Sequence, residues 1–190
     1  MDRKPDPGQT PNLKRPLKKL YILSGAETDK KKSVCEQLKT TLTNSVYLNG
    51  KWCWNADPMV DTVETRYMVL QNICFLLNQF LVCSVYDNIV FGWVFDQTHT
   101  IESILGSLDK QDCTIRLIHL EENQPTQADP AALPKAEASD GKNQSASVLN
   151  GFSDPDILQV ISLDVASMDV NQIVEQILQL LFTRSDKCFR

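Results

Sequence analysis

A short polar stretch at residues 23–34 brings together the groups that bind phosphate. It reads LSGAETDKKKSV, so that one glycine is followed by three consecutive lysines and a serine. Backbone N–H groups at the start of a helix attract anions, a lysine ammonium neutralises phosphate charge, and a serine hydroxyl can hold Mg²⁺. The stretch therefore predicts a cofactor-binding site made of Gly25, Lys30, Lys31, Lys32 and Ser33.

The spacing matches the phosphate-loop pattern G-x-x-x-x-G-K-[ST] only in part. Counted from Gly25, Lys31 falls on the lysine position. Lys30 replaces the second glycine, where the backbone must approach the phosphates closely and adopt dihedral angles that a Cβ disfavours. Lys32 replaces the hydroxyl that would bind Mg²⁺, and Ser33 comes one place later.

Two acidic residues inside this loop, Glu27 and Asp29, would repel a polyphosphate. Three interpretations follow. The stretch is a degenerate phosphate loop, which is the interpretation we favour, or a weak anion site at a helix N-terminus, or a charged loop that only caps the helix.

The elements around this loop alternate between buried strands and amphipathic helices. Continuous apolar runs predict strands, and apolar residues at helical spacing predict helices. We expect strands at 19–24, 45–48, 88–95, 113–120 and 158–163, and helices at 31–43, from Asp57-Pro58 to about 82, at 100–108 and at 168–182. This order predicts an α/β fold with a doubly wound, mainly parallel five-stranded sheet between helices, and it places the Gly25 loop at the ligand-binding edge.

The length of 190 residues predicts one domain, at 18–182. Residues 1–17 are polar, basic and rich in proline, residues 122–155 have few large apolar side chains, and 183–190 form a C-terminal tail. Because such compositions bury too little apolar surface, we expect the first two segments to be disordered. Nine of the 19 Lys and Arg residues fall in the first 32 positions, so the basic tail is a further candidate for contact with an anionic surface.

Composition also limits the compartment and the partners. The six cysteines include no C-x-x-C pair and mostly sit in apolar segments, and no apolar signal peptide opens the chain, so we expect a cytoplasmic protein. The net charge of −5 makes nucleic acid an unfavourable partner. The most apolar stretch, residues 73–95, is interrupted by Asn, Gln and Asp residues and therefore predicts no membrane span.

Several segments together give the chain a family resemblance. Besides the Gly25 loop they are VYLNGKWCW (46–54), VETRYMV (63–69), NIVFGWVF (88–95) and SLDVASMDVNQIVEQILQLL (162–181). In this order they resemble the small P-loop kinases that phosphorylate nucleosides, nucleotides or small hydroxylated metabolites. The resemblance covers roughly residues 18–120 and 157–182, and it implies the P-loop nucleoside triphosphate hydrolase fold and a nucleotide-binding site at the Gly25 loop.

Departures from the family pattern concern the catalytic groups. Asn49 and Lys51 stand where such kinases often have acidic residues, and no arginine follows Arg116 in the region of the phosphoryl-clamping lid until Arg184. The remaining candidates for catalytic contacts are two residues. One is Arg66, which could face an acceptor pocket or form a surface salt bridge, and the other is Asp96, at the end of the predicted third strand.

These departures favour a pseudoenzyme, a kinase-like protein with a non-catalytic binding or regulatory role. We then expect no cofactor, and a partner that is an unknown protein or a small anionic ligand. The alternative is an active kinase that uses ATP and Mg²⁺ with an atypical phosphate-binding loop.

Overall fold

The computed structural model describes residues 17–25, 28–93, 98–122 and 157–182. Within them the chain forms one five-stranded sheet in the order β2-β3-β1-β4-β5, with every neighbouring pair parallel. The strands are β1 (Lys18–Gly25), β2 (Ser45–Asn49), β3 (Asn88–Gly92), β4 (Cys113–Glu121) and β5 (Ile157–Asp164). The helices are α1 (Asp29–Thr41), the 3-10 helix η1 (Gly50–Trp54), α2 (Val63–Val82), α3 (Thr98–Gly106) and α5 (Val170–Phe182).

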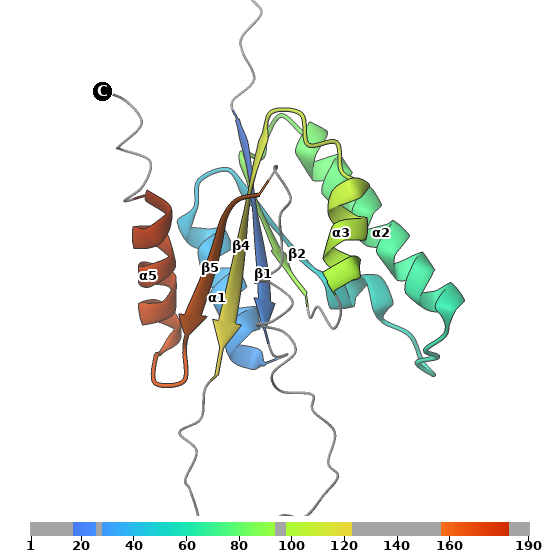
Figure 1. Ribbon diagram of the computed structural model, residues 1–190, viewed down its shortest axis with the longest axis horizontal. Helices are drawn as coiled ribbons and strands as arrows, with labels where there is room; N and C mark the ends of the chain where they lie inside the picture. Colours follow the sequence, from blue (N-terminus) through green and yellow to red (C-terminus); the bar gives the residue numbers. More distant parts are fainter. Residues whose placement is uncertain (1–16, 26–27, 94–97, 123–156, 183–190) are drawn as a thin grey trace, which may run out of the picture.

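Helices cover both faces of the sheet (Figure 1). Helices α1 and α5 lie on one face and α2 and α3 on the other. The alternation of side chains along β1 divides the core in two, because Leu20 and Ile22 pack toward α2 and α3 while Tyr21 and Leu23 pack toward α1 and α5. This arrangement confirms the predicted doubly wound, three-layer α/β fold.

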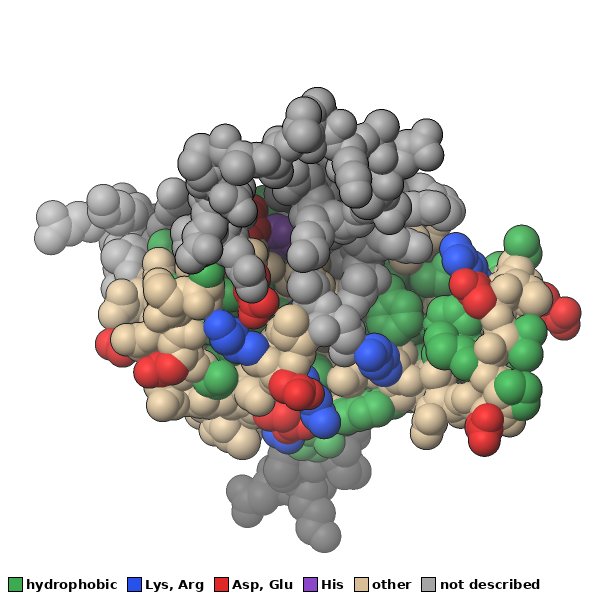
Figure 2. All heavy atoms as spheres, turned by 90° about the horizontal axis from the view of Figure 1, so that it is seen from below, with side chains coloured by type: hydrophobic (Ala, Val, Ile, Leu, Met, Phe, Trp, Pro, Cys, Tyr) green, Lys and Arg blue, Asp and Glu red, His purple; other side chains and the backbone are tan. Residues whose placement is uncertain are grey.

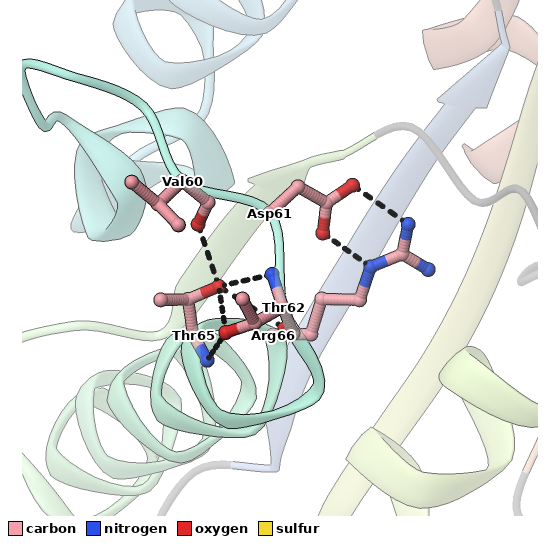
Figure 3. Close-up of polar contacts among 5 residues, drawn as sticks. All are labelled: Val60, Asp61, Thr62, Thr65 and Arg66. Atoms are coloured by element: carbon pink, nitrogen blue, oxygen red, sulfur yellow. Dashed lines mark hydrogen bonds and ion pairs between the residues drawn. The ribbon is translucent and has the colours of Figure 1, made fainter.

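Helix α2 begins later than the sequence pattern predicted. We expected Asp57-Pro58 to open it, but residues 57–62 are non-helical and the helix starts at Val63. The cause is a capping box in which the Thr62 hydroxyl accepts the Thr65 N–H at 3.2 Å and the Thr65 hydroxyl accepts the Thr62 N–H at 2.8 Å. These two side chains, shown in Figure 3, satisfy N–H groups that a helix end leaves without partners.

Strand β3 is also shorter than predicted, since pairing ends at Gly92 and not at residue 95. Beyond the strand, the Trp93 N–H still donates to Leu23 O of β1 at 3.1 Å. Residues 94–97 lie outside the described part. The predicted disordered segments 1–17 and 122–155 and the tail 183–190 also lie outside it, apart from Leu17 and Glu122 at its margins.

At the amino-end edge of the sheet, Lys18 is buried and holds the turn after α2. Its ammonium donates to the carbonyl oxygen of Cys83 at 2.6 Å and to that of Tyr86. Because each carbonyl would otherwise lose a hydrogen bond, this lysine ties β1 to the chain that leads into β3. No helix in the described ranges is both long and apolar enough to cross a membrane.

Candidate functional site

The predicted loop lies at the carboxyl-end edge of the sheet, which Figure 2 views face on. Acidic and basic side chains both appear on this edge. The parallel register brings together residues from three strands, because Gly25 of β1 is paired with Leu120 of β4, and Glu121 of β4 with Asp164 of β5. In doubly wound sheets this edge is where ligands bind.

Gly25 occupies a position that only glycine fits. Its φ angle is +120°, a region that L side chains rarely adopt. A Cβ built on it would lie 2.3 Å from Leu120 O, which is backbone and cannot rotate away. The first glycine of the predicted loop is therefore required by its own φ angle and by the contact between β1 and β4.

Lys31 is the lysine that the structure places at the strand ends. It is buried, and its ammonium donates to Gly25 O at 3.0 Å and to Trp93 O at 3.3 Å. Its backbone N–H donates to the Thr28 hydroxyl at 3.2 Å, which makes Thr28 the N-cap of α1. The helix therefore begins at Asp29, two residues earlier than predicted, and Lys31 points from its first turn toward the sheet edge.

Lys30, next to Lys31 in the sequence, contacts the chain that follows β5. Its ammonium donates to Val165 O at 3.0 Å and stands 3.8 Å from Glu122 Oε1. Thr28, Lys30, Lys31, Leu120, Glu122 and Val165 line a crevice of about 10 Å³. That volume accommodates at most about one water molecule, so a phosphate group does not fit inside this crevice.

Lys32 and Ser33 are not brought to this edge. Both are exposed, and with Asp29, Glu36, Gln37 and Thr40 they line a shallow open depression along the outer side of α1. Of the five predicted cofactor-binding residues, the structure thus gathers Gly25, Lys30 and Lys31, and it separates the Ser33 hydroxyl from them.

Of the two predicted catalytic residues, the structure describes Arg66 and not Asp96. Asp96 lies outside the described residues. Arg66 forms a bidentate ion pair with Asp61, with Nε to Oδ1 at 2.6 Å and Nη2 to Oδ2 at 2.8 Å, and both side chains are about half exposed (Figure 3). The hydrogen bond from Arg66 lowers the pKa of the Asp61 carboxyl. Of the two interpretations that the sequence left open for Arg66, the geometry realises the salt bridge, and a catalytic role stays a prediction.

The end of β2 carries a polar turn packed under an aromatic ring. Asn49 Oδ1 accepts the Lys51 N–H at 3.0 Å and so caps η1. A Cβ on Gly50 would lie 1.8 Å from the Trp93 ring, so the ring sits directly on this glycine. The Asn49 amide is thereby used to shape the turn.

A buried serine–histidine pair at the same edge was not recognised in the sequence. The Ser24 hydroxyl lies 2.9 Å from His119 Nδ1, and both residues are buried. Burial lowers the pKa of His119, the positive charge of Lys31 lowers it further, and Glu121 raises it. The two residues are 95 positions apart, and only the register of β1 against β4 pairs them, so no local signal could have revealed the contact.

The described residues contain no group of three or more His, Cys, Asp or Glu side chains able to hold a metal ion. The cysteines in the described ranges, Cys35, Cys53, Cys74, Cys83 and Cys113, form no disulfide. The reducing compartment that we expect from the cysteine pattern stays a prediction.

Comparison with solved structures identifies the fold. A sugar kinase from a Janibacter species matches with a TM-score of 0.57 and 13% identity over 86% of this chain and 94% of that one. A gluconokinase from Sinorhizobium meliloti 1021 matches with a TM-score of 0.52 and 12% identity over 90% and 99% of the two chains. The tunicamycin resistance protein of Deinococcus radiodurans also matches at 0.52, with 12% identity over 87% and 96%.

The chain has a P-loop kinase-like fold. This finding confirms the resemblance that the sequence segments indicated. No family model matches the sequence, and no curated protein matches it either. At 11–13% identity the likeness extends to the fold, and the chemistry of this chain has to be argued from its own residues.

Proposed function

We propose that this protein is a non-catalytic kinase-like module that binds a small phosphate-bearing anion at the carboxyl-end edge of its sheet. In this proposal it does not turn over Mg²⁺–ATP. The observation that carries the proposal is the position of the two loop lysines. The Lys30 side chain is 29% exposed beside the buried Lys31, the crevice that they line measures only about 10 Å³, and the Ser33 hydroxyl lies on the outer side of α1.

Phosphoryl transfer depends almost entirely on positioning the phosphates and stabilising their charge. In this chain the Lys31 ammonium donates to two backbone carbonyls, and the Lys30 ammonium donates to a third. A polyphosphate would have to replace these contacts and approach Glu122, 3.8 Å from Lys30, against charge repulsion. A small anion that engages one exposed part of the Lys30 ammonium meets a lower barrier than a nucleotide.

One observation favours the alternative of an active ATP-dependent kinase. Lys31 projects from the first turn of α1 to the end of β1, beside a glycine with positive φ, as a phosphate-binding lysine must. In that case Lys31 would contact the phosphates of ATP, Ser33 would have to turn inward to reach Mg²⁺, and Asp96 would supply a polar contact in the cleft.

Calorimetric titration with inorganic phosphate and with ATP, each with and without Mg²⁺, tests the proposal. Lys30→Met keeps the apolar stem of the side chain and removes its charge, and Lys32→Ala removes an exposed lysine from the outer side of α1 as the matched control. We expect weak, salt-sensitive phosphate binding that Lys30→Met reduces severalfold and Lys32→Ala leaves unchanged, with no gain from Mg²⁺. Equal losses in the two variants would show that the lysines act only through net charge.

A variant with the phosphate-loop pattern restored tests whether the Gly25 loop derives from a phosphate loop. Lys30→Gly with Lys32→Ser restores the second glycine and the hydroxyl of the phosphate-loop pattern. A former phosphate loop should gain affinity for Mg²⁺–ATP on reversion. No gain, in a variant that melts like the wild type, would favour the interpretation of a charged helix cap.

A further inference from the structure

From Tyr67 onward, the outer face of helix α2 is exposed and uncharged, and it carries apolar side chains bordered by neutral amides. Eight large apolar side chains between residues 59 and 85 are 47–87% exposed. From Tyr67 to Tyr86 the sequence contains no Asp, Glu, Lys or Arg over 20 consecutive residues, although 23% of the chain is charged. Figure 2 shows hydrophobic side chains gathered on the α2 side of the molecule, at the right. Large apolar patches of this kind mark binding surfaces.

The apolar side chains form a straight stripe at heptad spacing. Met68, Phe75 and Val82 are 47%, 64% and 54% exposed, and steps of seven residues keep them on one side of the helix. They lie opposite the residues that α2 buries in the core, which include Ile73 and Leu77. The stripe is therefore free of any role in the core of its own chain.

Polar amides beside the stripe have different roles. The Asn78 side chain is used within the chain, where it donates to Ser107 O at 3.0 Å and accepts the Asp109 N–H at 2.8 Å. Asn72 and Gln79 are exposed next to the stripe and carry no charge. An apolar centre bordered by neutral amides is the composition of a protein interface whose core is depleted of charge.

We propose that the outer face of α2 pairs with the same face of a second copy of this chain, the two helices running antiparallel across a two-fold axis at Phe75. The stripe is symmetric about that residue, since Met68 and Val82 are each seven positions away. A two-fold axis there stacks Phe75 on Phe75 of the second copy and packs Met68 against Val82 of the second copy. A self-complementary surface of this kind is what an isologous dimer requires.

The area and the charge of the face favour a dimer that forms in a concentration-dependent way. At about 150–200 Å² for a fully exposed large side chain, the three stripe residues expose roughly 250–330 Å² per copy, which is less than the about 800 Å² that a standard interface buries on each partner. The exposed amides of Gln71, Asn72 and Gln79 beside them enlarge the contact. The net charge of −5 makes two copies repel over most of their surfaces, and the uncharged α2 face minimises that repulsion. A membrane-surface helix would instead carry Lys and Arg along its polar face, and Arg66 is the only basic residue of α2.

Light scattering coupled to gel filtration of the full chain, over a wide concentration range, tests the proposal. We expect the wild type to have twice the mass of the chain and Phe75→Glu to have the mass of one chain. Gln176→Glu places the same charge on an exposed position of α5 and should leave the doubled mass unchanged. Circular dichroism checks that each variant keeps the fold, which Phe75→Glu should do because the side chain is already mostly exposed.

Mixing variants of opposite charge tests the axis itself. Phe75→Glu and Phe75→Lys should each be single chains alone and should recover the doubled mass when mixed, because the two-fold axis places the two substituted residues together. A wild type with the mass of one chain at every concentration would overturn the proposal, as would a Phe75→Glu protein that stays paired. Sedimentation of a single-chain wild type with vesicles of phosphatidylcholine and phosphatidylserine would assign the face to a membrane surface and also overturn it.

Discussion

Replacement of Gly25 by alanine should destabilise the protein strongly, because two separate costs add at this position. An L residue at φ +120° is strained, which costs roughly 1–3 kcal/mol. Its Cβ would also lie 2.3 Å from Leu120 O and 3.2 Å from Leu120 C, so the β1–β4 pair must shift, at a cost of roughly 1–3 kcal/mol for overpacking.

The free energy of unfolding of Gly25→Ala should therefore fall by about 2–6 kcal/mol. For a chain of this size about 1 kcal/mol corresponds to a shift of roughly 2–4 °C in melting temperature, so the variant should melt about 4–24 °C below the wild type. Thermal and urea unfolding followed by circular dichroism measure both quantities.

Gly106 offers a matched control at the end of α3. A Cβ there meets no atom within 4 Å. Alanine at a helical position is more favourable than glycine by up to about 1 kcal/mol, so Gly106→Ala should be neutral or slightly stabilising. If Gly25→Ala melts within about 2 °C of the wild type, the close approach of β1 to β4 does not limit this position and our account of the loop geometry is wrong.

Two further predictions concern buried ionisable side chains. Lys18→Met should lower the free energy of unfolding by about 1–3 kcal/mol, because it leaves two backbone carbonyls without their donor, whereas Lys19→Met at the neighbouring, partly exposed position should cost less in the same urea titration. Burial lowers the pKa of His119 below its ordinary 6.5. The unfolded chain then binds a proton that the folded chain does not, so stability should decline as pH falls from about 7 to about 5. His119→Gln should flatten that decline, and an unchanged pH profile would contradict the assignment.

The sequence predicted the fold well because the fold depends on the distribution of apolar residues. The run from Ile89 to Gly92 is apolar, and with Asn88 it is buried on both faces, as a central parallel strand is. The start of α2 was wrong because the Asp57-Pro58 pair looks like a helix opening, whereas the two threonines at 62 and 65 form the actual capping box. Local capping geometry of this kind is decided by side-chain hydrogen bonds that periodicity does not reveal.

The candidate site could be predicted only in part. The motif identified Gly25 and Lys31 as neighbours, and the structure brings them within hydrogen-bond distance. The direction of Ser33 could not be read from spacing, because the Thr28 cap sets where the helix begins and hence which residues face the sheet edge. Contacts such as Lys30 with Val165 join residues 135 positions apart and follow from strand order alone.

The most direct test of the central claim is the release of phosphate from ATP by the full chain with Mg²⁺, compared with Lys31→Met. Transfer to a panel of nucleosides, nucleotides and sugars is followed in the same reactions. We predict that the wild type and Lys31→Met are indistinguishable from buffer, because the crevice beside Lys31 has room for about one water molecule and the Ser33 hydroxyl lies on the outer side of α1. Turnover by the wild type that disappears in Lys31→Met would contradict the account and establish an active kinase.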